Sequence, residues 1–303
     1  MKSKWTIKIL DTIDQMVEAE DLQRIVWPGS ETDIVPAHLL ITAVHNGGFV
    51  LGAFPAGQDR EMSVPLVGFA FGFPGIYTTP DGPRLKHCSH ILAVHPEFRS
   101  KGLGFKLKRA QWQLVRKQGV DRITWTYDPL LSRNAHLNIS RLGAVCNTYR
   151  RDVYGAMRDG LNIGLASDRF EVDWWVNSQR VQKRLSSRAR PRLDLPHYIS
   201  AGAQILNPTQ LVQKEWVVPE KSAGSILENF PVDSNPAILL VEIPSDFLAL
   251  KDADVDLAKD WRSTTRMIFE GLFRRGYIVT DFVHLAEKFP RSYYVLSHGD
   301  VTL

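Results

Sequence analysis

One loop of the chain combines the residue types that bind phosphate groups in proteins. The segment Arg99–Gly104 reads Arg-Ser-Lys-Gly-Leu-Gly; it follows an apolar stretch and leads into an amphipathic one. The first amides of a helix have no acceptor within the helix, and with the positive end of the helix dipole they bind anions. Glycines allow a positive φ and a close approach of the backbone, while Arg99 and Lys101 add positive charge. The segment therefore predicts a pyrophosphate site.

Two common pyrophosphate-binding loops differ from this segment. A dinucleotide-binding loop needs Gly-x-Gly-x-x-Gly at the first strand-to-helix turn and an acidic residue about 20 positions later. The Walker lysine pattern is absent as well. The observed spacing is Arg-x-x-Gly-x-Gly after Val-x-Pro, in the middle of a domain. The alternative interpretation is a glycine-terminated loop that only begins a basic helix.

The spacing and its surroundings resemble motif A of the GNAT superfamily of N-acyltransferases, Arg/Gln-x-x-Gly-x-Gly/Ala after a Val-x-Pro strand. The order of predicted elements from Trp5 to Val176 is also similar to theirs, so the resemblance covers somewhat more than half of the chain. It implies acyl-coenzyme A (acyl-CoA) as the donor and no metal. By this resemblance the pyrophosphate is bound by Arg99, Ser100, Lys101, Gly102, Leu103 and Gly104.

The resemblance also implies how the rest of the donor is held. The main chain at Leu92 and Val94 would pair with the pantetheine arm as a strand does, and a backbone N–H there would stabilise the oxyanion of the intermediate. Asn134 would form a hydrogen bond with the pantetheine. The alternative for Asn134 is an exposed polar position on a helix.

A base is needed to take the proton of the attacking amine. Family members often carry it on the motif A strand, on the face of Leu92 and Val94. Period-two alternation predicts that this face includes His90 and Cys88 and excludes His87 and Ser89. His90 is the preferred base because an imidazole titrates near neutral pH; the alternative is a histidine packed within the sheet. In the loop after the strand, Glu97 and His95 are weaker candidates.

Many GNAT enzymes carry a tyrosine that protonates the departing thiolate, four residues before the glycine that ends the second helix–strand unit. That glycine is Gly143 here, and the tyrosine position holds Ile139. The departure leaves solvent, Tyr127 or Tyr149 as substitutes. It also motivates a second hypothesis, a CoA-binding protein that has lost catalysis.

Several further segments resemble a narrower group of long, poorly characterised GNAT proteins, some of them linked to N-succinylation of amino acids: Tyr154–Asn162, Ser167–Phe170 and Trp174–Trp175. This resemblance implies acetyl-CoA or succinyl-CoA as donor and a small amine, such as an amino acid, as acceptor. Arg262 and Arg266, one helical turn apart, could bind a substrate carboxylate. The alternative is a solvated helix face paired with Asp256 or Asp260.

Positive charge is concentrated in two runs without acidic residues. Seven Lys and Arg residues lie between Phe98 and Val120, and six lie between Gln179 and Leu193. The rest of the chain holds 24 basic and 33 acidic residues, a net charge of −9. This local pattern favours one polyanionic ligand. Nucleic-acid binding is a third hypothesis, disfavoured by the acidic remainder and by the lack of aromatic residues in the second run.

The elements that position these residues follow from periodicity and from glycine and proline. From Trp5 to Val176 the predicted order is strand, two helices, three strands, helix, strand, helix and two strands. The third of those helices spans Leu103–Gln118, with Leu103, Leu107, Ala110 and Leu114 on its apolar face. Beyond it we expect a strand at Ala237–Ile243, a helix at Asp254–Arg275 and strands at Tyr277–Leu285 and Tyr293–Ser297.

This order predicts an α+β or α/β fold: a GNAT-like mixed, mostly antiparallel sheet flanked by helices, with an additional C-terminal α+β region. We expect a catalytic domain over residues 1–177, a basic linker over 178–195 and a C-terminal region of unknown role over 196–303. The 303 residues are 44% hydrophobic and include two cysteines. This composition is that of a folded chain without a disulfide framework, a cysteine-based zinc site or a membrane span, so we expect a cytoplasmic protein. A homodimer is possible for such a family.

Overall fold

The computed structural model of the chain describes residues 4–29, 31–57, 65–155, 164–186, 192–212, 216–219, 223–228 and 236–299. Its described residues form two compact units. The first holds residues up to Trp125 together with Trp175–Asn177, and the second holds the remainder from Thr126 onward. The units therefore do not divide at the predicted boundary of residue 177.

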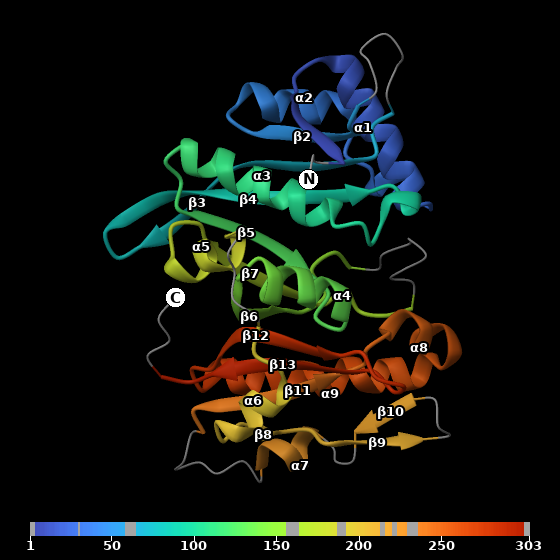
Figure 1. Cartoon of the computed structure of the whole chain (residues 1–303), viewed down its shortest axis with the longest axis vertical. Coiled ribbons are helices and arrows are strands. Elements are labelled where there is room, and N and C mark those ends of the chain that lie inside the picture. The colour runs from blue at the N-terminus through green and yellow to red at the C-terminus, as the bar shows by residue number, and fades with distance from the viewer. Residues whose placement is uncertain are drawn as a thin grey trace. The chain divides into compact units, whose positions relative to one another are not determined.

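The first unit contains a sheet in the order β1-β2-β3-β4-β5, covered by helices (Figure 1). Adjacent strands are antiparallel except β4 and β5, which are parallel. Its strands are β1 (Trp5–Leu10), β2 (Phe49–Pro55), β3 (Gly68–Thr79), β4 (Gly82–Val94) and β5 (Arg122–Tyr127, which ends in the second unit). Its helices are α1 (Ile13–Val26), α2 (Ala37–His45) and α3 (Leu103–Lys117), with the short turns η1 (Glu31–Asp33) and η2 (Pro96–Phe98).

Local sequence explains where these helices begin and end. Thr12 caps α1: its hydroxyl accepts from the Gln15 amide, and the Gln15 side chain accepts from the Thr12 amide. Gly102 precedes α3 with a φ of 77°, and Gly119 follows it with a φ of 75°, both in the left-handed region. Helix α3 thus matches the predicted Leu103–Gln118 within one residue.

The two faces of the sheet of the first unit are covered differently. On one face Phe69, Phe71, Ile91 and Ala93 pack with residues of α1 and α2 in one apolar core. On the other face lies α3: a Cβ placed at Gly68 would lie 3.3 Å from Leu103 and 3.4 Å from Leu107. The buried residues of α3 are Leu103, Leu107, Lys108, Gln111 and Val115. Its buried face is therefore turned from the predicted one toward Lys108 and Gln111.

A β-bulge in β4 changes which residues share a face. Phe71 pairs with Ile91 and Gly72 pairs with Ser89, so His90 is an extra residue on β4. Because Val94 lies opposite Gly68, it belongs to the α3 face, and Leu92 belongs there with it. The period-two expectation for this strand is therefore wrong. Beyond the bulge, His87 and Ser89 share the α3 face with Leu92 and Val94, whereas Cys88 and His90 lie on the α1/α2 face.

The second unit contains a sheet in the order β7-β6-β12-β13-β11-β8 and a separate hairpin of β9 and β10. Its strands are β6 (Val145–Arg150), β7 (Arg169–Trp175), β8 (Gln204–Ile205), β9 (Thr209–Val212), β10 (Trp216–Pro219), β11 (Ile238–Ile243), β12 (Ile278–Leu285) and β13 (Arg291–Ser297). Its helices are α4 (Ser132–Ala135), which continues as the π-helical segment η3 (His136–Arg141), α5 (Gln179–Leu185), α6 (Leu195–Ser200), α7 (Ala223–Glu228), α8 (Phe247–Ala253) and α9 (Val255–Arg274).

The predicted mixed, mostly antiparallel sheet flanked by helices is confirmed. The predicted element order up to Val176 is also found, and so are the strands and long helix assigned near the C-terminus. The part expected as a basic linker instead begins with a folded helix, α5, which Ser178 caps and which buries Val181 and Leu185. Residues 187–191 of that stretch lie outside the described part of the chain.

We expect Gly72→Ala to destabilise the first unit. A Cβ at this position of β3 would lie 2.2 Å from His87 Nε2 and 2.7 Å from the Cys88 carbonyl oxygen, so the backbone or the buried ring must move. The expected loss is about 1–3 kcal/mol of unfolding free energy, measured by chemical denaturation. Gly224→Ala is the matched control because a Cβ there meets nothing within 4 Å. Equal stability of the two variants would contradict the prediction.

Candidate functional site

The phosphate-binding segment predicted from the sequence forms the turn between η2 and α3. Ser100 and Gly102 both have left-handed backbones, with φ values of 62° and 77°. Lys106 N donates to Gly102 O at 3.2 Å, which is the first hydrogen bond of α3. The amides of Leu103 and Gly104, at the start of the helix, have no acceptor within it. A Cβ at Gly102 would meet no atom within 4 Å, so the turn is open at this point.

Two cations border this turn. Arg99 is exposed, and its guanidinium is held by two carbonyls: Nε donates to Val94 O at 3.3 Å and Nη2 donates to Val26 O at 3.5 Å. The Lys101 ammonium lies 5.0 Å from the centre of the Phe98 ring. Phe98 in turn packs edge-on against Trp5. The turn thus carries positive side chains in supported positions beside helix amides, which is an arrangement suited to a pyrophosphate.

One edge of β4 is open beside this turn. Strands β4 and β5 pair at His87↔Ile123 and Cys88↔Thr124 only, so their described residues separate after Cys88. His95 N donates to Val67 O on the β3 side, and the main-chain groups of successive strand residues alternate in direction. The main-chain groups of Val94 and Leu92 therefore point toward the open edge. An extended chain can add to such an edge as a further strand.

His90 lies where β4 leaves β5. His90 is exposed as a whole residue, although its ring packs against the rings of Phe71 and Phe73, each with a centroid distance of 6.0 Å. Partial burial among these rings lowers the pKa of His90 from its ordinary value of 6.5. The side chain is therefore a neutral, accessible base at neutral pH. Glu97 is exposed on η2, and its amide donates to Nδ1 of His95, which caps that turn.

Neither the position of the family's tyrosine nor the two tyrosines considered as substitutes provides an available acid. Ile139 is fully buried in η3. The Tyr127 hydroxyl forms a hydrogen bond with Tyr294, and the Tyr149 hydroxyl donates to Asp168 at 2.8 Å. Burial raises the pKa of both phenols, so neither has the properties of a ready proton donor. Asn134 is half-buried on α4 in the second unit.

A buried polar cluster links α3 to β4 on the α3 face. Lys108 Nζ donates to Ser89 Oγ at 2.8 Å and to Gln111 Oε1 at 3.1 Å, and Ser89 Oγ donates to the same oxygen at 2.9 Å. Gln111 Nε2 lies 3.2 Å from His87 Nε2. Burial lowers the pKa of Lys108 well below its ordinary value and lowers that of His87 to about 3. The sequence does not indicate this cluster, because Lys108 stands among seven cations of a basic run, yet its side chain is only 2% exposed.

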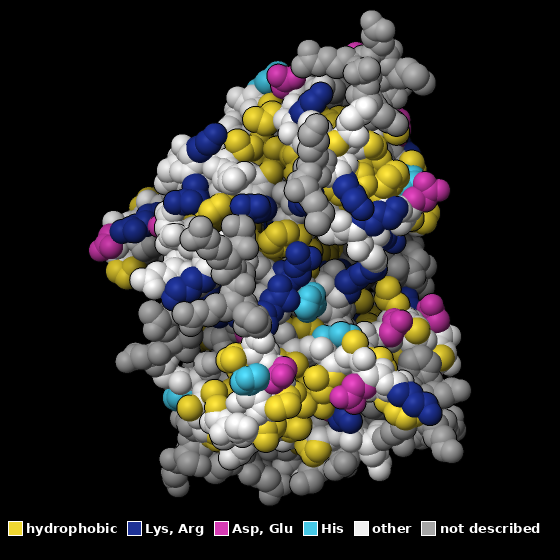
Figure 2. All heavy atoms as spheres, in the orientation of Figure 1, with side chains coloured by type: hydrophobic (Ala, Val, Ile, Leu, Met, Phe, Trp, Pro, Cys, Tyr) yellow, Lys and Arg dark blue, Asp and Glu magenta, His cyan; other side chains and the backbone are white. Residues whose placement is uncertain are grey.

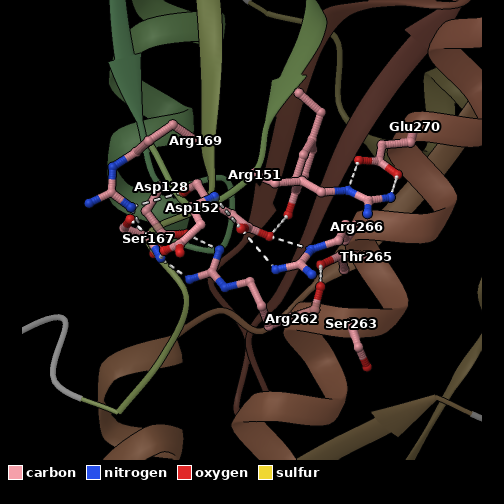
Figure 3. A network of polar contacts seen from close by, with 12 residues as sticks. Asp128, Arg151, Asp152, Ser167, Arg169, Arg262, Ser263, Thr265, Arg266 and Glu270 are labelled. Atoms are coloured by element: carbon pink, nitrogen blue, oxygen red, sulfur yellow. Dashed lines mark hydrogen bonds and ion pairs between the residues drawn. The ribbon is translucent and has the colours of Figure 1, made fainter. Parts of the chain in front are cut away.

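Arg262 and Arg266 lie in a polar network of the second unit (Figure 3). Arg262 is 4% exposed, and both of its terminal nitrogens donate to the Asp128 carboxylate. Arg266 donates to both oxygens of Asp168, at 2.7 and 2.9 Å. Burial alone would raise the pKa of Asp168, but the hydrogen bond from Arg266 holds it below its ordinary value. Both expectations for these arginines are wrong: they neither pair with Asp256 or Asp260 nor present free guanidiniums to a ligand.

The second basic run is also partly structural. Arg184 donates to Asp281 at 2.6 Å, and Arg180 donates to the carbonyls of Gly143 and Thr280. Figure 2 shows lysine and arginine side chains interspersed with apolar ones over the face it displays, rather than in one continuous band. Arg180 and Arg184 therefore attach α5 to the rest of the second unit.

Three observations concern metal sites, membrane-spanning helices and cysteines. Within the described ranges, no three His, Cys, Asp or Glu side chains gather as metal ligands. Within the same ranges, no helix combines the length and the apolar character that are needed to cross a bilayer. Cys88 and Cys146 are free thiols.

Known proteins similar to this chain are found among solved structures. No protein family matches the sequence, and no curated protein matches it. Among solved structures, the chain is similar to several acetyltransferases. A protein from Desulfovibrio desulfuricans described as a member of the GNAT family shares 14% identity over 57% of this chain and 99% of its own, with a TM-score of 0.42.

Two further structures are of named enzymes. The ribosomal-protein-S18-alanine N-acetyltransferase of Escherichia coli shares 17% identity over 57% of this chain and 94% of its own, with a TM-score of 0.41. NAA60 of Arabidopsis thaliana, in complex with acetyl-CoA, shares 11% identity over 56% of this chain and 99% of its own, with a TM-score of 0.45.

We expect Asp128→Ala to unfold the second unit more easily. The substitution leaves the buried Arg262 guanidinium without its carboxylate, which costs about 3–5 kcal/mol in buried pairs. The double variant Asp128→Ala/Arg262→Met removes both charges and should recover part of this loss. Both are measured by chemical denaturation. A single variant as stable as the unmodified protein would contradict the role assigned to this pair.

Proposed function

We propose that the protein is an acyl-CoA-dependent N-acyltransferase that transfers an acetyl or succinyl group to the amine of a small acceptor, an amino acid being the acceptor class favoured by the sequence. The observation that carries this proposal is the turn Arg99–Gly104, where left-handed Ser100 and Gly102 lead into the first amides of α3 beside two supported cations. The open edge of β4 adjoins the same turn. Together they offer a diphosphate site and a strand-like site for an extended arm.

The donor would lie along these two features. Its diphosphate would bind the amides from Ser100 to Gly104 and the side chains of Arg99 and Lys101. Its pantetheine arm would pair with the main chain at Leu92 and Val94. The thioester would then reach the point where β4 and β5 separate, which is also the position of His90.

The reaction that this arrangement supports is direct transfer. The acceptor nitrogen attacks the thioester carbonyl carbon, a carbon–nitrogen bond forms, and the carbon–sulfur bond breaks as the thiolate leaves. His90 takes the proton of the attacking amine, directly or through water, since its depressed pKa keeps it unprotonated. A backbone N–H of the open edge stabilises the oxyanion. Solvent protonates the thiolate, because Ile139 cannot and the hydroxyls of Tyr127 and Tyr149 are engaged in hydrogen bonds.

A second candidate is a CoA-binding protein without turnover. The specific observation in its favour is the fully buried Ile139 at the position of the family's acidic tyrosine. Thiol release measured over an amino-acid panel with acetyl-CoA and with succinyl-CoA separates the two candidates. Turnover above the background rate supports the transferase, and tight CoA binding without turnover supports the second candidate.

Removal of the two cations of the turn should weaken donor binding. Each charge-assisted contact contributes about 1.5–3 kcal/mol, so Arg99→Ala and Lys101→Ala should each raise the Kd for acetyl-CoA about tenfold or more. Calorimetry gives the Kd. Lys117→Ala, which removes an exposed cation at the other end of α3, is the matched control and should bind as the unmodified protein does. Unchanged affinity in the first two variants would refute the proposed diphosphate site.

The base assignment predicts a pH dependence. Because the folded pKa of His90 lies below 6.5, kcat/KM should be level above about pH 7 and fall as the pH drops through the lowered pKa and His90 gains a proton. His90→Ala should lose this acid limb together with about 10²–10⁴-fold in kcat. Glu97→Gln serves as the control for the weaker candidate. Retention of the acid limb in His90→Ala would exclude His90 as the base.

A further inference from the structure

The structure contains a buried lysine that the proposed reaction does not use. Lys108 reaches from α3 to the sheet, and its amine donates to Ser89 of β4 and to Gln111 of its own helix. The same amine lies 3.6 Å from the centre of the Trp125 ring on β5. One side chain therefore contacts both strands at the place where they begin to separate.

A buried lysine at this position lowers the stability of the folded protein unless its contacts offset the cost of desolvation. Removal of an amine from water carries a penalty, and a leucine or methionine would fill a similar volume without it. The observed contacts recover part of that penalty through two hydrogen bonds and an aromatic neighbour. What these contacts provide, and an apolar side chain would not, is a directional attachment to Ser89, the residue immediately before the bulge.

Such an attachment can hold β4 in register at its bulge. A strand that slips by one residue exchanges the two faces of all its side chains. In β4 a slip that absorbed the extra residue would move Ser89 and His87 from the α3 face to the apolar α1/α2 face and move His90 the other way. The hydrogen bonds that join Ser89 with Lys108 and Gln111, and His87 with Gln111, form only in the observed register.

We propose that Lys108 is a positioning residue that, through Ser89, fixes the register of β4 at its bulge and thereby presents His90 on the α1/α2 face. The proposal rests on the proposed function insofar as it gives His90 a catalytic role. The positioning itself is a property of the free protein. It predicts that loss of the attachment alters the surroundings of His90, although Lys108 and His90 lie on opposite faces of the sheet.

The test uses three variants of the full chain and the nuclear magnetic resonance titration of His90, assigned with His90→Gln. In the unmodified protein its pKa should lie below 6.5, as burial against Phe71 and Phe73 requires. In Lys108→Met and in Ser89→Ala the pKa of His90 should move toward 6.5, and the chemical shifts of its ring should change. Ser89→Ala changes no charge, so agreement between the two variants excludes a direct electrostatic effect of the amine. Lys117→Met, a lysine lost from the exposed end of α3, should leave His90 unchanged.

An unaltered His90 titration in both folded variants would overturn the proposal. If Lys108→Met fails to fold, Ser89→Ala decides alone, because it removes one oxygen atom from the cluster. This readout needs no turnover, so it stands even if the unmodified protein transfers no acyl group, a result that would refute the proposed function only.

Where turnover is observed, kinetics add a second criterion. Misplacement of a base by about 1 Å costs on the order of 10²-fold in rate, so Lys108→Met should lower kcat by that order. The KM for acyl-CoA should change little, since Leu92 and Val94 pair with β3 beyond the bulge, and a slip that absorbed the extra residue would leave that pairing in place. In the His90→Ala background the same substitution should have no further effect on kcat. An equal loss in both backgrounds would show that Lys108 does not act through His90.

Discussion

The extra residue in β4 is the constraint on which the candidate site depends. An antiparallel partner imposes strict alternation on a strand, and His90 interrupts it by standing unpaired between Ser89 and Ile91. One strand can therefore send polar residues to α3 on one side of the interruption and keep Leu92 and Val94 on that same face beyond it. The imidazole of His90 lies on the opposite face, where burial against aromatic rings lowers its pKa.

The divergence of β4 and β5 adds a second requirement at the same place. Paired strands satisfy each other's main-chain groups, so an edge that opens within a sheet needs support from side chains or a ligand. Here α3 provides the side chains on one face, with Lys108 between Ser89 and Trp125. Its N-terminus, at the far end of β4, provides amides and a left-handed turn. A single helix thus supports both ends of the opened edge.

Much of this arrangement was accessible from the sequence. Glycine and proline mark the boundaries of the elements, and apolar periodicity identifies α3 and α9, so the order of elements and the position of the turn before α3 were predicted correctly. The bulge was not, because His87, Cys88, Ser89 and His90 suit a regular strand as well as an interrupted one. The burial of Lys108 was hidden because a basic run usually indicates a solvated helix face.

The ion pairs of α9 were beyond prediction for a different reason. Arg262 and Asp128 are 134 residues apart, and Arg266 and Asp168 are 98 apart, so nothing local relates them. A charge at a helix position normally indicates the solvent side, and here two arginines instead lie beside Trp261 and Ile268 on the side that faces the interior. Only the tertiary structure brings each arginine to its carboxylate.

The joined charges of Arg262 and Asp128 restrict how this protein can change over generations. A substitution at either position alone strands the opposite charge in the interior, and the cost is a large share of the stability that a typical domain possesses. A substitution at one of the two positions is therefore tolerated only together with a matching substitution at the other, or after other substitutions have raised the stability of the protein. Positions 128 and 262 should accordingly co-vary among the homologues of this protein.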